Sequence, residues 1–325
     1  MKIGSRRSLR TLAVVAVGAA ALAACSSQGG AQNGGGSTGK SYTIAMVTHE
    51  APGDTFWDKI RNGAEAAAKN HNVTLKYSND PDAGKQATLI QNAVDSKVDG
   101  IATTLPSPDA IGPAAQAAVT AGIPVVAFNA GLDQYKQYGA MMYFGSDEDL
   151  AGQTVGQKIV QATPNSHTLC VIQLQGQVQL EARCAGVKKT DPNTENINVN
   201  GTDLPSVQQT IGAKLQQDPS ITDVVTLAGD VALAAQKATA DAGSKAKIAT
   251  FDLSQDVAKQ IQSGGIALSV DQQPYVQGYM AVTALWLNLT NGNDIGGGGP
   301  VLTGPAIVDK SNIDKIIPYT ENNTR

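Results

Sequence analysis

Polar side chains with planar hydrogen-bonding groups gather where the apolar segments of this sequence end. They belong to Asp, Asn, Gln, Glu, Arg and His, and aromatic rings stand beside them. The segments that carry them are 49–57, 105–109, 128–131, 175–183, 228–230, 251–253 and 271–274. A hydroxyl group donates one hydrogen bond and accepts two, and the face of a small ring is apolar. This inventory therefore predicts a site for a sugar or polyol.

The sequence favours binding over catalysis. No Gly-x-Gly-x-x-Gly follows the first apolar segment, and no serine lies in a nucleophile elbow. The three histidines have no ligand-like spacing to the cysteines, so we expect no metal, and we expect no cofactor and no enzymatic activity. A carbohydrate-active enzyme stays as an unfavoured alternative, because Asp230 and Asp252 are carboxylates that could flank a glycosidic bond.

The elements that must position these groups alternate between strand and helix. Residues 42–48 form an apolar, β-branched run typical of a buried parallel strand, and Thr55 can cap a helix over 56–71. Further strands are expected near 72–77, 98–104, 123–128, 140–144, 169–174, 196–199, 223–226, 247–251 and 266–270, with helices between them. This order predicts an α/β protein with parallel sheets, and the length of the folded part favours two similar Rossmann-like lobes. We expect Gly296–Gly299 to be a flexible connection.

The first 24 residues are predicted to be an export signal. Arg6, Arg7 and neighbouring bases precede an apolar run that is too short to span a bilayer, and Cys25 follows small residues. The pattern resembles the lipobox of bacterial lipoproteins, in which the cysteine carries the lipid. An ordinary secretory signal is the alternative, and the route, general secretory or twin-arginine, stays open. We expect a lipid-anchored, extracytoplasmic protein.

Residues 25–40 are predicted to be a flexible tether, because they contain no apolar residue larger than alanine beyond the cysteine. Removing residues 1–24 leaves 20 of the 24 basic side chains and all 28 acidic ones. An acidic body argues against nucleic acid as a partner. In an oxidising compartment we favour a disulfide between Cys170 and Cys184, with two buried free thiols as the alternative.

From residue 42 to about 310 the chain resembles a substrate-binding protein of a bacterial sugar ABC transporter, in the ribose-binding-protein-like family. The resemblance rests on IAMV, the pair Phe56-Trp57, VDGIATTLPSPDA, GIPVVAFNAG, EARCAG, Gly229-Asp230, IATFD and DQQPYVQGY, which occur in this order. It implies a type I periplasmic-binding fold with a three-strand hinge, crossing near 145, 272 and 302. It also implies a monomer that closes on ligand and docks on a permease.

The implied lobes are residues 41–145 plus 273–303, and residues 146–272 plus 304–317. A ligand-binding sensor for a membrane receptor or kinase would share this fold, and the sequence leaves that alternative open.

The resemblance also assigns roles to single residues. Phe56 and Trp57 match the stacking aromatic residues, although either ring could belong to the core. Asn129 stands where the family has a strand-end acid. Ala130 stands where the family often has a basic residue, and this departure puts a ribose-like hydroxyl pattern in doubt. Leu105, where the family often has a polar residue, is another departure.

The remaining assignments lie mostly in the second half of the chain. Arg183 matches a sugar-binding arginine, with a surface ion pair to Glu181 as the alternative, and Gln272 matches a hinge glutamine. Asp230 and Asp252 match carboxylates that hold hydroxyl groups, or they cap helices. The expected ligand contacts are His49, Asp54, Phe56, Trp57, Asn129, Glu181, Arg183, Asp230, Asp252 and Gln272.

Overall fold

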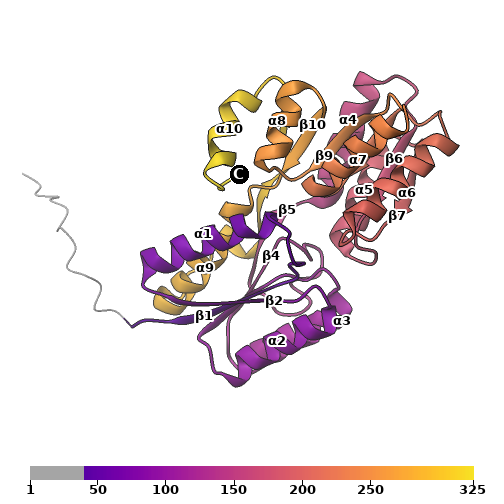
Figure 1. Ribbon diagram of the computed structural model, residues 1–325. Coiled ribbons are helices and arrows are strands. Elements are labelled where there is room, and N and C mark those ends of the chain that lie inside the picture. The colour runs from indigo at the N-terminus through magenta and orange to yellow at the C-terminus, as the bar shows by residue number, and fades with distance from the viewer. Residues whose placement is uncertain (1–39) are drawn as a thin grey trace, which may run out of the picture. The chain divides into compact units, whose positions relative to one another are not determined.

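Two six-stranded sheets organise the folded part of the chain in a computed structural model, which describes residues 40–325 (Figure 1). The predicted export signal and Cys25 lie outside the described residues, as does almost all of the predicted tether. Within 41–325, the first lobe comprises the first sheet and the helices packed on it, and the second lobe comprises the second sheet and its helices. The predicted α/β class, with two lobes of largely parallel strands, is confirmed.

The first sheet is entirely parallel and has the order β11-β5-β4-β3-β1-β2. Its strands are β1 (Thr43–Thr48), β2 (Thr74–Asn79), β3 (Gly100–Thr103), β4 (Val125–Phe128), β5 (Met142–Ser146) and β11 (Pro300–Gly304). The helices of this lobe are α1 (Phe56–His71), α2 (Ala83–Asp95), α3 (Pro108–Thr120) and α9 (Pro274–Asn291). In Figure 1, α1 and α9 lie together on one face of the sheet, and α2 and α3 lie on the other.

The second sheet repeats this plan, with the order β12-β10-β9-β8-β6-β7 and one antiparallel edge strand, β12. Its strands are β6 (Thr168–Ile172), β7 (Thr194–Asn198), β8 (Asp223–Thr226), β9 (Lys247–Phe251), β10 (Leu268–Asp271) and β12 (Ala306–Asp309). The helices are α4 (Glu148–Ala162), α5 (Val178–Thr190), α6 (Leu204–Gln217), α7 (Gly229–Asp241), α8 (Gln255–Ser263) and α10 (Ile313–Glu321).

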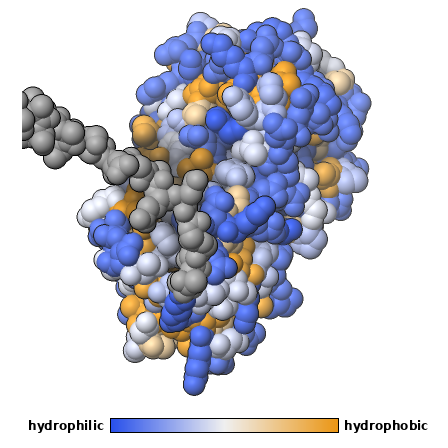
Figure 2. All heavy atoms as spheres, turned by 90° about the vertical axis from the view of Figure 1, so that its left-hand side faces the viewer, coloured by the Kyte–Doolittle hydropathy of each residue, from blue (hydrophilic) through white to orange (hydrophobic). Residues whose placement is uncertain are grey.

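Alternation along the central strands gives each sheet two buried faces. Ile44 and Met46 of β1 pack with α1 and α9, whereas Ala45 and Val47 pack with α2 and α3. Successive strand residues point to opposite faces, so a strand that is apolar throughout needs helices on both sides. On the outer surface, hydrophobic residues form small patches among hydrophilic ones on the face in Figure 2. None of the helices within residues 40–325 is both long and apolar enough to cross a bilayer.

The chain passes between the two sheets three times. It leaves β5 at Ser146 and enters α4 at Glu148, returns from β10 into α9 over residues 271–274, and passes from β11 to β12 over residues 304–306. These positions are close to the three expected crossings. Three adjacent crossings are a hinge in which a few residues can absorb the rotation of one lobe against the other.

Some local predictions are corrected. The second strand begins at Thr74, because Asn72 takes a left-handed conformation that caps α1. Thr55 makes no side-chain cap; the carboxylate of Asp54 accepts the Phe56 N–H instead, at 3.0 Å. A single 3₁₀ turn covers Gly296–Gly298, and the flexibility expected of this glycine connection stays a prediction.

Cys170 of β6 and Cys184 of α5 form a disulfide, with their Cα atoms 5.9 Å apart. Both residues are fully buried in the cluster where α4 and α5 cover the second sheet. The bond therefore fastens the middle of α5, which carries several candidate site residues, to β6, the strand next to the edge of the second sheet.

Candidate functional site

A small chamber of about 50 Å³ lies where the carboxyl ends of strands from the two sheets face each other. Both lobes line it, and we call this set of residues the binding chamber. Of the predicted contacts, those that line the chamber are His49, Asp54, Phe56, Trp57, Asn129, Arg183, Asp252 and Gln272. Sequence reasoning therefore selected residues that the fold brings together from positions more than 200 residues apart.

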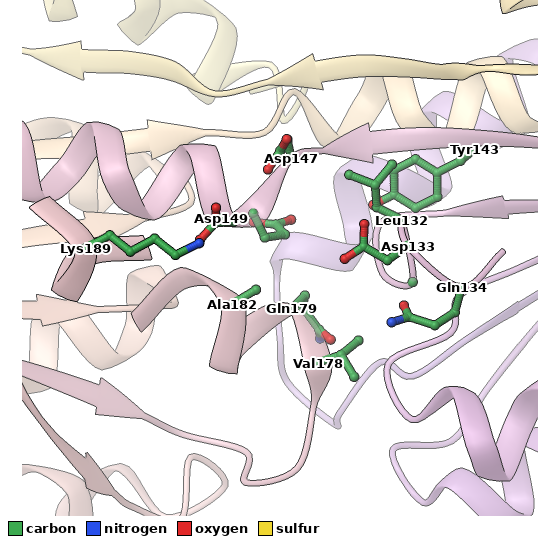
Figure 3. A pocket seen from close by; sticks show the side chains of 12 residues that line it. Leu132, Asp133, Gln134, Tyr143, Asp147, Asp149, Val178, Gln179, Ala182 and Lys189 are labelled. Atoms are coloured by element: carbon green, nitrogen blue, oxygen red, sulfur yellow. The ribbon is translucent and has the colours of Figure 1, made fainter. Parts of the chain in front are cut away.

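Two wider cavities flank the chamber. One, of about 420 Å³, shares Asp54, Phe56 and Asp252 with the chamber and also includes Asp230. The other, of about 410 Å³, lies between the loop after β4 and the start of α5, where Gln134 and Gln179 are seen in Figure 3. Glu181 lies with neither group, because its side chain is exposed on α5 and lines none of these three cavities.

Asn129 and Asp252 occupy equivalent places in the two lobes. Each follows a phenylalanine that ends a strand, each has positive φ (64° and 69°), and each donates its N–H to the neighbouring strand at 2.9 Å. Asn and Asp tolerate the left-handed conformation better than other residues with a side chain. The sharp turn aims both side chains at the chamber, which explains these residue types at the strand ends.

His49 is held by a buried hydrogen-bond network. Its Nδ1 lies 2.8 Å from Thr104 Oγ1, and the amide of Gln86 donates to the same hydroxyl at 3.0 Å. Burial, with the Arg183 guanidinium nearby, lowers the pKa of His49 to about 3, so the ring is neutral. Its Nε2 lies 3.3 Å from the Nε2 of Gln179 in the second lobe, so a neutral ring nitrogen accepts from that amide.

A second contact joins the lobes beside this one. The backbone N–H of Val178 donates to the carbonyl of Pro106 at 2.9 Å, which links the start of α5 to the loop before α3. Together with the hydrogen bond between His49 and Gln179, it describes a closed arrangement. The small volume of the chamber agrees with this state.

The two aromatic residues divide between core and site. Trp57 is 3% exposed and packs in the apolar cluster beneath α1 and α9, with its ring edge-on to His49 at 4.7 Å. Phe56 is partly exposed and lines both the chamber and the 420 Å³ cavity. Of the two rings that the sequence proposed for stacking, Phe56 is the more available to a ligand.

Arg183 is buried, and its partner differs from the alternative considered for it. The guanidinium makes two hydrogen bonds to Glu148 of α4, at 2.6 and 3.1 Å, rather than a surface ion pair with Glu181. It also donates to the carbonyl of Leu227 at 3.1 Å and lies 4.5 Å from the ring centre of Phe251. Burial raises the pKa of Glu148, although the guanidinium opposes this.

Two carboxyl groups of the chamber are strongly perturbed. Burial raises the pKa of Asp252 from 3.8 to about 7, and it raises that of Asp54 from 3.8 to about 6. The Arg183 guanidinium and the Gln272 amide lower the pKa of Asp252 in part, while the Asp54 carboxylate adds to the increase. Lys59, 2% exposed, lies near both acids, and burial lowers its pKa.

Sequence reasoning missed several residues of this region. Gln173, Gln177 and Gln179 line the chamber, Lys59 lines the adjoining cavity, and Glu148 holds Arg183. The repeated glutamines of QLQGQVQ at 173–179 were the available signal, but amides are common in exposed loops. Lys59 and Glu148 lie inside helices, where a charged residue usually faces water.

A glycine-rich pattern at residues 34–41, GGGSTGKS, matches the phosphate-loop spacing and was overlooked in the sequence. A phosphate loop joins a strand to the helix that follows it. Here the residues after the pattern enter β1, and no helix begins before Phe56 in the described part of the chain. The context needed for phosphate binding is therefore missing.

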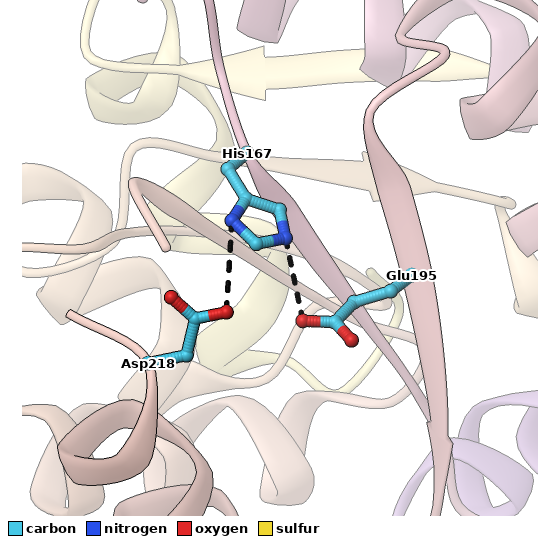
Figure 4. A group of neighbouring side chains, drawn as sticks. All are labelled: His167, Glu195 and Asp218. Carbon is cyan, nitrogen blue, oxygen red and sulfur yellow. Dashed lines mark ion pairs between the residues drawn. The ribbon is translucent and has the colours of Figure 1, made fainter. Parts of the chain in front are cut away.

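His167, Glu195 and Asp218 form a group that could reach a shared cation, near the opposite ends of β6 and β7 from the chamber (Figure 4). The Nε2 of the histidine lies 3.3 Å from Glu195 and its Nδ1 lies 3.9 Å from Asp218, so the two carboxylates face different nitrogens. Lys214 already lies 2.9 Å from Glu195. We interpret the group as an ion-pair network that joins the edge strand to α6.

Comparison with known proteins identifies the same architecture. The family model described as a periplasmic binding protein domain matches residues 44–294. A carbohydrate transporter from Acidothermus cellulolyticus 11B, solved in complex with myo-inositol, is 57% identical and has a TM-score of 0.86; the match covers 88% of this chain and 100% of that one.

Two further relatives are more distant. A periplasmic sugar-binding protein of an ABC sugar transporter from Legionella pneumophila is 25% identical, with a TM-score of 0.75 over 81% of this chain and 99% of that one. The xylose/arabinose-binding protein of Sulfolobus acidocaldarius is 26% identical over 217 residues, which are 62% of this chain. The match spans about half, 54%, of that curated relative.

Proposed function

Because the chain belongs to the family of periplasmic binding protein domains, we propose that it is the extracytoplasmic solute-binding component of an ABC importer. It captures a monosaccharide or small polyol reversibly between its lobes and delivers it to permease subunits. The solute is bound without chemical change, so the protein is not an enzyme. Myo-inositol is the first candidate ligand, because the 57% identical relative was solved with it.

The observation that carries this proposal is the chemistry of the binding chamber. Amides, carboxyl groups, a guanidinium and an imidazole from both lobes converge on it beside the ring of Phe56. Such groups match hydroxyl groups around a small ring, and an apolar face can lie on the aromatic side chain. Two lobes can both contact one ligand only when they are closed around it, so ligand binding and closure are coupled.

The lining of the chamber indicates how the cycle proceeds. Residues of both lobes line it, and Asn129, Arg183 and Gln272 among them are buried. A ligand held between the two lobes enters when the lobes part. The three crossings supply the hinge, and the contacts of Gln179 with His49 and of Val178 with Pro106 break when the lobes open.

Within this scheme we assign roles to the candidate residues. Phe56 carries the apolar face of the ligand, while Asn129 and Asp252 contact hydroxyl groups from the two strand ends. Arg183 presents the rim of its guanidinium, and Gln272 contacts the ligand from the hinge. His49 and Asp54 complete the contacts on the side of the first lobe, and Asp230 is within reach only of a ligand that extends into the 420 Å³ cavity.

The location follows from the family and from the N-terminal sequence. We propose that residues 1–24 are removed, that Cys25 carries a lipid in the cell membrane, and that residues 25–40 tether a monomeric body outside the cytoplasm. The lobe boundaries predicted from the sequence belong to the same proposal. Mass spectrometry of the exported protein tests the lipid on Cys25 directly.

Thermal unfolding with a panel of sugars and polyols tests the binding function. A ligand present at about 100 times its Kd stabilises the folded protein by about 2.7 kcal/mol, whereas a compound that does not bind leaves the midpoint unchanged. Calorimetry then gives the affinity, and recovery of the compound unaltered distinguishes capture from catalysis. The proposal would be refuted if neither myo-inositol nor any other polyol or sugar in the panel shifted the unfolding midpoint.

A further inference from the structure

Three glutamine side chains of the binding chamber have a carbonyl oxygen without a partner. Gln173, Gln179 and Gln272 are 9%, 5% and 2% exposed, and the Oε1 atom of each is buried with no hydrogen bond. All three line the chamber. A buried acceptor that lacks a partner destabilises the state in which it is buried, so this set of atoms indicates a missing donor.

The orientation of two of these amides is fixed by their nitrogen atoms. Gln179 donates to Gln177 Oε1 at 2.7 Å and lies against the ring nitrogen of His49, while Gln272 donates to a carboxyl oxygen of Asp252. Turning either amide over would place oxygen against an oxygen or nitrogen acceptor. The free atoms of Gln179 and Gln272 are therefore acceptors, and they stay acceptors when a ligand arrives.

Donors around the chamber already have some protein partners. The guanidinium of Arg183 donates to Glu148 and Leu227, the amide nitrogen of Asn129 donates to Gln277, and the ammonium group of Lys59 donates to the carbonyl of Thr55. The three glutamine oxygens, in contrast, have none. A ligand that gives hydrogen bonds supplies the partners that these oxygens lack.

We propose that Gln173 and Gln179 are specificity-determining residues that, with Gln272, select a polyol by its hydroxyl hydrogens. The inference rests on the proposed function and names the subset of polyols that the site takes. An alcohol group can donate to a carbonyl oxygen, whereas a methyl ether, a deoxy position or an ionised phosphate cannot. The protein accepts unmodified polyols and rejects their O-methylated, deoxygenated and phosphorylated derivatives at the positions that face these glutamines.

A ligand series on the unmodified protein is the first test, with calorimetry as the measurement. Myo-inositol is compared with its mono-O-methyl ethers, its monodeoxy derivatives and an inositol monophosphate. Because each lost donor leaves a buried carbonyl unpaired, at least one O-methyl and one deoxy derivative should bind about tenfold or more weakly. The monophosphate should bind most weakly of all.

Variants then connect the discrimination to the residues. Gln173→Met and Gln179→Met keep the length of the side chain and remove the acceptor, and Gln217→Met, at an exposed position near the end of α6, is the matched control. Each chamber variant should bind myo-inositol about 3 to 10 times more weakly. It should also lose its discrimination against one particular deoxy derivative, because the hydroxyl group and the carbonyl form one pair. The control should keep both affinity and discrimination.

The outcomes separate this inference from the proposed function. If the unmodified protein binds no polyol, both fail. If it binds myo-inositol but binds every deoxy and O-methyl derivative equally well, or if the variants weaken all ligands by the same factor, the selection by Gln173 and Gln179 is refuted while the binding function stands. Thermal unfolding of the ligand-free variants identifies any that do not fold, and the ligand series on the unmodified protein then decides.

Discussion

Replacing Asp252 by asparagine should make the stability of the ligand-free protein less dependent on pH. Asp252 has positive φ, 69°, and its carboxyl oxygen accepts from the Gln272 amide. Asparagine tolerates the same backbone conformation and offers the same acceptor oxygen, so the substitution removes mainly the charge. Few other positions in the chamber permit so clean a change.

The direction of the effect follows from the raised pKa of the carboxyl group. Burial raises the pKa of Asp252 from 3.8 in the unfolded chain to about 7 in the folded protein, so the folded state binds the proton more tightly between these values. Stability from this group is present below about pH 4 and is lost as the pH rises to about 7. One pKa unit corresponds to about 1.4 kcal/mol, which sets an upper limit of about 4 kcal/mol.

Urea unfolding at about pH 4 and about pH 8 measures this quantity. The Asp252→Asn protein should match the unmodified one at the lower pH and exceed it by about 2 to 4 kcal/mol at the higher. His49, whose pKa is lowered to about 3, gives a trend of opposite sign below about pH 6.5, but it is present in both proteins and cancels. A difference that does not change with pH would show that the carboxyl group is solvated in the ligand-free protein, and the reasoning from a closed chamber would fail.

Three further predictions concern ligand contacts and structural support. Phe56→Ala should weaken polyol binding by about 1 to 3 kcal/mol in calorimetry with little loss of stability, whereas Trp57→Ala should cost about 3 to 5 kcal/mol in urea unfolding; the reverse pattern would exchange their roles. Arg183→Met should lower the free energy of unfolding by about 3 to 5 kcal/mol, because it leaves Glu148 buried without a partner. Adding Glu148→Leu should restore most of that loss. If neither change affects stability in urea unfolding, the ion pair is solvated and the prediction is wrong. Cys184→Ala should lower stability by about 3 kcal/mol through loss of the 14-residue link, and equal midpoints with and without reductant for the unmodified protein would contradict this.

The fold was predictable where the apolar pattern of a strand or helix in the sequence matches its burial in the structure. The strands at 223–226 and 247–251 and the helix at 56–71 have the predicted bounds, because apolar runs and helical spacing there agree with burial. The edge strands β11 and β12 and the helix α10 were not identified as elements. Their sequences are mixed and partly exposed, and their pairing depends on strands more than 30 residues away, such as β5 for β11.

The positions of the site residues at strand ends were predictable from the sequence, but the hydrogen-bonded pairs that these residues form were not. Arg183 was placed at the site, yet its partner Glu148 lies 35 residues away on a different helix, which a local reading could not select over Glu181. The sequence also could not decide between Phe56 and Trp57, since adjacent helical residues point about 100° apart and either could face the core. Packing of α1 against α9 settles which ring is buried.

The energetics of the chamber explain how a ligand can control closure. The closed arrangement buries three unpaired carbonyl oxygens and raises the pKa of two carboxyl groups, so without a ligand it carries unfavourable terms that the open state relieves by hydration. Hydrogen bonds from hydroxyl groups remove those terms only when the lobes are together. A ligand shifts the equilibrium between the open and closed states by its difference in affinity for them. Here that difference arises from the glutamine acceptors, which water satisfies in the open state and the ligand satisfies in the closed state. A chamber whose polar groups were all paired could close stably without a ligand. This chamber closes stably only around a ligand that donates hydrogen bonds.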